Sequence, residues 1–194
     1  MDLVCVGSLN VDLISYMPAF PAPGETILGT SFQQGLGGKG ANQAAAAARL
    51  RAPGERVRMV GAVGDDALGR DYLDPAGAFA AAGVDCAGVA VARGVSTGVA
   101  PIMVNAAGEN CIVVVPGANG RVDAALVDAA LRGGGALGGL LVQLEVPLAA
   151  TLAALRAAAA LRAPAFFTPA PAPPAGLADD AFFALTSVLI PNEG

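Results

Sequence analysis

The chain has 194 residues, 55% apolar and 14% charged, so we expect one sizeable domain with a substantial core. A net charge of −5 and the lack of a basic stripe argue against nucleic acid and anionic membrane surfaces as partners. The absence of histidine excludes Ser-His-Asp and Cys-His catalysis and histidine-ligated metal sites. Met1 leads almost directly into an apolar strand, and no apolar run reaches membrane-spanning length, so we expect a cytoplasmic protein.

Short apolar runs alternate with helical patterns along most of the chain. Buried strands are predicted at residues 3–9 and 57–63, and further strands at residues 139–146 and 187–191. Helices are predicted at residues 42–50, 122–131, 147–162 and 178–185. This alternation indicates an α/β fold, with a mostly parallel, Rossmann-like sheet flanked by helices.

Two segments, 12–36 and 97–116, break the alternation with β patterning and no crossover helix. We predict that they pair as a small separate sheet, a lid beside the α/β core, with antiparallel edge strands of the main sheet as the alternative. Within the second segment, AAGEN is the expected turn of a hairpin. Pro75 predicts either a helix kink or a new helix start capped by Asp74.

The cysteines Cys5, Cys86 and Cys111 are odd in number and form no C-x-x-C pair. A disulfide framework and a zinc site are therefore not indicated. We interpret all three as small buried side chains in a reduced compartment.

A glycine-rich stretch, GLGGKGANQAAAAARL, occupies residues 35–50 ahead of an alanine-rich helix. Its glycines match the dinucleotide fingerprint G-x-G-x-x-G, but that fingerprint should directly follow the first strand, and here a long β-patterned segment intervenes. A Walker loop would need Ser or Thr after Lys39, where the chain has Gly40. Close helix–sheet packing would explain the glycines but not Lys39 and Asn42 at the start of a helix.

The segment GGKGANQA at 37–44 resembles the first signature of the ribokinase branch of the PfkB carbohydrate kinases. Other segments similar to that family follow its order: GSLNVD (7–12), PGE (23–25), VGAVGDDALG (60–69), STGVA (96–100), PGAN (116–119), QLEVP (143–147), TPAPA (168–172) and PNE (191–193). The resemblance implies a ribokinase-like fold that phosphorylates D-ribose at O5 to ribose 5-phosphate, using ATP, Mg²⁺ and a monovalent cation such as K⁺. It also raises the expectation of a homodimer formed through the lid.

By resemblance, one set of residues would hold the sugar: Asn10, Asp12, Gly37, Gly38, Lys39, Asn42, Ala100, Ile102 and Glu145. A neutral sugar needs oriented acceptors and donors, which carboxylates and amides supply. The glycines would let the backbone approach the sugar, and Ala100 and Ile102 would close over it from the lid.

Structural roles are the alternative for each of these residues. Asn10 and Asp12 are typical of turns and caps, and Ala100 and Ile102 are typical of core packing. Glu145 could be a surface residue, although a carboxylate among apolar neighbours at a strand end is costly without a partner.

The family's D-T-x-G-A-G-D motif, which holds the aspartate base and the anion hole, does not occur in these 194 residues. By resemblance, Asn192 would lie near the ATP phosphates and magnesium, and the chain carries no catalytic residue and no protein-only metal site. We therefore expect the N-terminal portion of a ribokinase with a C-terminally truncated fold, inactive alone. The alternatives are a non-catalytic sugar-binding or interaction module and, less favoured, a dinucleotide-binding protein.

Overall fold

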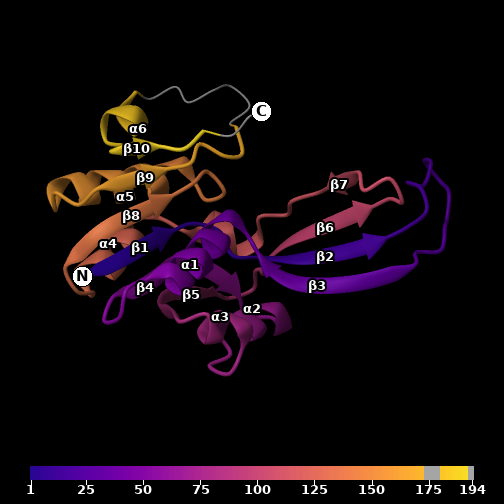
Figure 1. Ribbon diagram of the computed structural model, residues 1–194, viewed down its shortest axis with the longest axis horizontal. Coiled ribbons are helices and arrows are strands. Elements are labelled where there is room, and N and C mark those ends of the chain that lie inside the picture. Colours follow the sequence, from indigo (N-terminus) through magenta and orange to yellow (C-terminus); the bar gives the residue numbers. More distant parts are fainter. Residues whose placement is uncertain (173–179, 192–194) are drawn as a thin grey trace.

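The computed structural model describes residues 1–172 and 180–191. Its main sheet has six strands in the order β10-β9-β8-β1-β4-β5 (Figure 1). These strands are β1 (Asp2–Val6), β4 (Arg56–Gly64), β5 (Val84–Ala92), β8 (Leu137–Val142), β9 (Ala165–Phe167) and β10 (Val188–Leu189). Every pairing between neighbours is parallel, which confirms the predicted α/β class.

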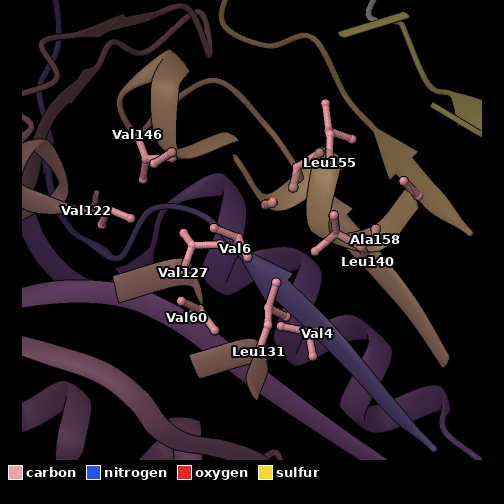
Figure 2. Packing of buried hydrophobic residues seen from close by; sticks show 14 of the residues in the cluster. Val4, Val6, Val60, Val122, Val127, Leu131, Leu140, Val146, Leu155 and Ala158 are labelled. Atoms are coloured by element: carbon pink, nitrogen blue, oxygen red, sulfur yellow. The ribbon is translucent and has the colours of Figure 1, made fainter. Parts of the chain in front are cut away.

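Helices cover both faces of this sheet. One face carries α1 (Lys39–Leu50), α2 (Ala67–Leu73) and α3 (Ala78–Ala81), and the other carries α4 (Ala124–Arg132), α5 (Leu148–Ala160) and α6 (Ala181–Ala184). Alternate residues of β1 face the two sides of the sheet. Val4 and Val6 pack toward α4 and α5 (Figure 2), while Cys5 belongs to the cluster under α1. None of the described helices is long and apolar enough to cross a membrane.

A second, four-stranded sheet has the order β3-β2-β6-β7 and extends away from the α/β body (Figure 1). It comprises β2 (Asn10–Tyr16), β3 (Ser31–Gly37), β6 (Gly98–Val104) and β7 (Asn110–Ile112). The β2–β6 pair is parallel, and the β2–β3 and β6–β7 pairs are antiparallel. We call these strands the small sheet; they are not edge strands of the main sheet.

Two buried polar side chains anchor the small sheet to the body. The Tyr72 hydroxyl, on α2, shares its one hydrogen between the carbonyl oxygens of Asn10 (2.8 Å) and Gly37, which lie on paired strands. The Thr97 hydroxyl, just before β6, donates to Asp66 Oδ1 (2.6 Å) and accepts from Gly64 N (2.9 Å).

Several local predictions needed correction. Helix α1 begins at Lys39 rather than at residue 42, so Lys39 is its first residue. Pro75 lies in the turn between α2 and α3, and Asp74 accepts from Ala76 N while Gly77 is the N-cap of α3. Strand β8 ends at Val142, so Glu145 lies in the loop after the strand and not at the predicted strand end.

The cysteines also differ from one another. Only Cys5 is fully buried, and burial raises the pKa of its thiol to about 12. Cys86 is partly exposed and Cys111, on β7, is exposed, so the prediction of three buried thiols was wrong for those two.

Candidate functional site

The start of helix α1 is capped by side chains that are distant in sequence. Its N-cap, Gly38, has a φ of 92° and no side chain to cap with. Glu145 Oε2 instead accepts from Lys39 N (2.9 Å), and Ser8 Oγ accepts from Gly40 N (3.3 Å). Ser8 Oγ also donates to Glu145 Oε2 (2.6 Å), so Ser8 and Glu145 together satisfy amide groups that a helix start leaves unpaired.

Glu145 also has an ionic partner. The Lys39 ammonium lies 3.8 Å from Glu145 Oε1, with the lysine side chain 41% exposed and that of Glu145 12% exposed. The helix start and the ammonium both attract the carboxylate of Glu145. Glu145 is therefore held in place by the body of the protein, and Lys39 is the one partner of its Oε1 among residues 1–172 and 180–191.

Asn10, the first residue of β2, is buried and paired with Asn119. Asn119 lies in the 3₁₀ helix Gly117–Arg121, and its Nδ2 donates to Asn10 Oδ1 (2.7 Å). The same Nδ2 donates to Leu9 O (3.1 Å), and Asn119 Oδ1 accepts from Leu9 N (2.8 Å). Both asparagines thus have fixed orientations.

A cavity of about 520 Å³ adjoins these groups, within the size range of small-molecule sites. Its polar lining includes Asn10, Lys39, Asn119 and Glu145, drawn from β2, α1, the 3₁₀ helix and the loop before α5. Its apolar lining includes Val114, Pro116, Leu144, Val146, Pro147 and Pro171. A few convergent polar groups on an apolar wall are typical of a site that orients a small ligand.

Asp12 lies two residues beyond Asn10 on β2 and faces the same side of the small sheet. Its carboxylate forms no hydrogen bond or ion pair with any residue in the described part of the chain. Burial, and then the negative charge of Glu145, raise the pKa of Asp12 above its usual value. A half-buried carboxylate without a protein partner is costly, and a ligand that donates hydrogen bonds would relieve that cost.

The two predicted glycines make room within the protein. A Cβ on Gly37 would lie 2.3 Å from Asp12 Oδ2, and one on Gly38 would lie 2.8 Å from Asn10 N. Glycine at these positions is therefore required by the Asp12 carboxylate and by the backbone of β2. That these glycines also let the backbone approach a sugar stays a prediction.

The remaining predicted residues are more scattered. Ala100 is buried opposite Asp12 on β6, and Ile102 is two pairs further along, opposite Ile14. Asn42 is exposed on α1 and lines a smaller hollow with Leu36 instead of the main cavity. Asn192 lies outside the described residues. Within the described residues there is no cluster of acidic or cysteine side chains that could hold a metal ion.

Ser8 and Asn119 are two site residues that sequence reasoning did not single out. Both are almost completely buried, and both lie inside segments that the family resemblance had marked, GSLNVD and PGAN. Polar residues inside such segments, next to glycine, were the available signal.

Comparison with known proteins decides the family. The model of the pfkB family of carbohydrate kinases matches residues 1–194. The chain belongs to this family. It is 41% identical over 196 residues to a ribokinase of Schizosaccharomyces pombe and 38% identical over 191 residues to a ribokinase of Mus musculus. The alignments cover 100% and 98% of this chain but 60% and 57% of those proteins.

Solved structures agree with this assignment. The ribokinase of Giardia lamblia superimposes with a TM-score of 0.86 at 33% identity, covering 99% of this chain and 57% of that one. An Arabidopsis thaliana ribokinase complexed with ribose and ATP gives a TM-score of 0.78 at 29% identity, covering 98% and 60%. The chain thus spans about 60% of the length of these family members.

Proposed function

We propose that this chain forms the sugar-binding part of a ribokinase, an enzyme that transfers phosphate from ATP to O5 of D-ribose. The observation that carries the proposal is the Asp12 carboxylate, which is half-buried, lacks a partner among the described residues, and faces the same side as Asn10. The similarity to ribokinases of several organisms supports ribose as the sugar.

The cavity suits a neutral polyol because it presents both kinds of hydrogen-bonding group. In its lining, Glu145 is an acceptor for hydroxyl hydrogens, while Asn10 and Lys39 are donors to hydroxyl oxygens. Asp12 is not part of the cavity lining, but it lies two residues beyond Asn10 on the same face of β2 and would be a second acceptor for a sugar that reaches it. In this proposal these four side chains bind and orient the sugar, and the lack of a side chain at Gly37 leaves room for the Asp12 carboxylate. Ala100 and Ile102, on the same face of the small sheet, would pack over the sugar as a lid. Asn42 would contact the sugar only if its side chain turned away from the smaller hollow that it lines.

We assign no phosphoryl-transfer step to the described residues. They hold no candidate metal cluster, and no D-T-x-G-A-G-D segment occurs in the 194 residues. ATP, Mg²⁺ and a monovalent cation would be used by the complete kinase, with Asn192 on the ATP side. We therefore propose that the 194-residue chain alone binds ribose but does not phosphorylate it.

We also propose a cytoplasmic homodimer formed through the small sheet. Phe32, Ile112 and Val113 of its strands and adjoining loop are 61%, 51% and 59% exposed, and a contact between two small sheets would cover them.

Titration calorimetry with D-ribose tests the binding proposal. We expect Asp12→Ala and Glu145→Ala each to weaken ribose binding tenfold or more, because hydrogen bonds to charged groups contribute about 1.5–3 kcal/mol. Unfolding curves of each variant show whether it is folded. Unchanged affinity in both folded variants would contradict the site assignment.

A phosphorylation assay with ATP, Mg²⁺, K⁺ and D-ribose tests the second part. We expect no turnover by the 194-residue chain, and robust turnover would refute the claim that it lacks the transfer machinery. NADH fluorescence should not respond to the protein, whereas saturable binding would support the dinucleotide alternative. A D-T-x-G-A-G-D segment encoded in frame after Gly194 would favour a kinase over a non-catalytic sugar-binding module.

A further inference from the structure

The peptide groups of Leu9 fix the orientation of the Asn119 side chain. Leu9 N can only donate, so the atom of Asn119 that meets it at 2.8 Å must be the oxygen, Oδ1. Leu9 O can only accept, so the atom that meets it at 3.1 Å must be the nitrogen, Nδ2. The orientation of this amide therefore follows from the backbone.

This orientation is passed on to Asn10. Because Nδ2 of Asn119 donates its second hydrogen at 2.7 Å, the atom of Asn10 that receives it must be Oδ1. The Nδ2 group of Asn10 is then left without a hydrogen-bond partner among residues 1–172 and 180–191, in a side chain that lines the cavity.

We propose that Asn119 is a positioning residue that makes Asn10 a hydrogen-bond donor toward the ligand. The proposal rests on the sugar-binding function proposed above and adds a selectivity to it. Asn10 and Asp12 are about 7 Å apart along one face of β2, one donating and one accepting. Such a pair favours a polyol with closely spaced hydroxyls, since a hydroxyl oxygen can accept at Asn10 while hydroxyl hydrogens bond the carboxylate of Asp12.

Asn119 acts through Asn10 rather than by its own contact with the ligand. Both hydrogens of its Nδ2 are already used, by Leu9 O and by Asn10 Oδ1. Gly98 permits the close approach of the two asparagines, because a Cβ there would lie 2.2 Å from Asn10 Oδ1 and 2.3 Å from Asn119 Nδ2. The arrangement is therefore built around the asparagine pair.

The isosteric variant Asn119→Asp tests the proposal. The introduced carboxylate would still accept from Leu9 N, but it offers no hydrogen to Asn10, so the Asn10 amide would turn to donate to that carboxylate and present its own oxygen to the cavity. We expect at least a tenfold loss of D-ribose affinity by calorimetry. In an Asn10→Ala background the same change should cost less than twofold, because the effect passes through Asn10.

If Asn119 only stabilised the fold, the effect of Asn119→Asp on affinity would not depend on Asn10. Urea unfolding of the wild type, the two single variants and the double variant separates changes in stability from changes in affinity. An equal loss from Asn119→Asp in both backgrounds, or no loss in either, would overturn the proposal.

A ligand-free measurement separates this proposal from the proposed function. By NMR, hydrogen exchange of the Asn10 side-chain NH₂ group should be fast in the wild-type protein and slower in Asn119→Asp. If the wild-type protein fails to bind ribose, the proposed function fails, and the exchange experiment still decides the orientation. An Asn10 NH₂ group that is already protected in the wild-type protein would refute the proposal.

Discussion

The body and the small sheet contribute to the site in different ways. The body's Glu145 carboxylate is satisfied by Ser8, by Lys39 N and by the lysine ammonium. The small sheet's Asp12 has no such partner among the described residues, and its pKa is raised. In the proposed site, the body would therefore supply pre-arranged groups, while the small sheet would carry a carboxylate whose hydrogen bonds come from the ligand.

Removing the anchor between the two regions should have the largest effect. Thr97 is fully buried, and Thr97→Val deletes its hydroxyl bonds with Asp66 and Gly64 N. We expect the free energy of unfolding in urea to fall by about 2–3 kcal/mol, because a bond to a charged group is lost and a buried amide is left unpaired. Thr97→Ser keeps the hydroxyl and is the matched control; equal losses in both variants would contradict this role.

The anchor should also depend on pH. Burial alone would raise the pKa of Asp66, but hydrogen bonds from Thr97 and Gly69 hold it below its usual value. A lowered folded pKa stabilises the fold above the unfolded pKa of about 4, and this contribution is lost as the pH falls through the folded value. The loss of unfolding free energy caused by Thr97→Val should therefore become smaller at acidic pH. A loss that becomes larger there would contradict this explanation.

Two glycines of β3 differ in how closely an added side chain would approach Asp12. A Cβ on Gly37 would lie 2.3 Å from the Asp12 carboxylate, whereas one on Gly35 would meet nothing within 4 Å. We expect Gly37→Ala to displace that carboxylate and weaken D-ribose binding about tenfold, or roughly 1.4 kcal/mol. Gly35→Ala should leave affinity within about twofold of wild type. Calorimetry on both variants checks this, and similar behaviour of the two would contradict the role of Gly37.

The smallest effect should be a gain in stability. Asp12→Asn removes a half-buried charge, so we expect the Tm without ligand to rise by about 2 °C at pH 7. Because the folded pKa of Asp12 is raised, the gain should be complete above the folded pKa, fade as the pH falls through it, and vanish below the unfolded pKa of about 4. Asp71→Asn, an exposed carboxylate on α2, controls for net charge. A lower Tm for Asp12→Asn would argue that an internal partner had been lost.

The sequence predicted the architecture because its signals were local. Apolar runs marked the parallel strands, and the lack of a crossover helix marked the two segments of the small sheet. The start of α1 at Lys39 was missed because its capping side chains are distant in sequence. Ser8 is 32 positions from Gly40, and Glu145 is 106 positions from Lys39.

The site was less predictable for the same reason. That Glu145 needs a partner could be argued from its apolar neighbours, but which groups serve it depends on how β1, α1 and β8 meet. The roles of Asn119 and of Gly37 depend on distances of a few ångströms across strands. Asn42 matches a family segment, yet its helix position turns it away from the main cavity.

Carbon-13 NMR of the Asp12 carboxyl group, titrated with and without saturating D-ribose, tests the central claim most directly. Without ligand, its pKa should lie above the usual value for aspartate, because of burial and the charge of Glu145. Ribose hydroxyls that donate to the carboxylate stabilise its charged form, so the pKa should fall when ribose binds. An Asp12 pKa that does not change when the protein binds ribose would contradict the claim that ribose hydroxyls donate hydrogen bonds to the Asp12 carboxylate.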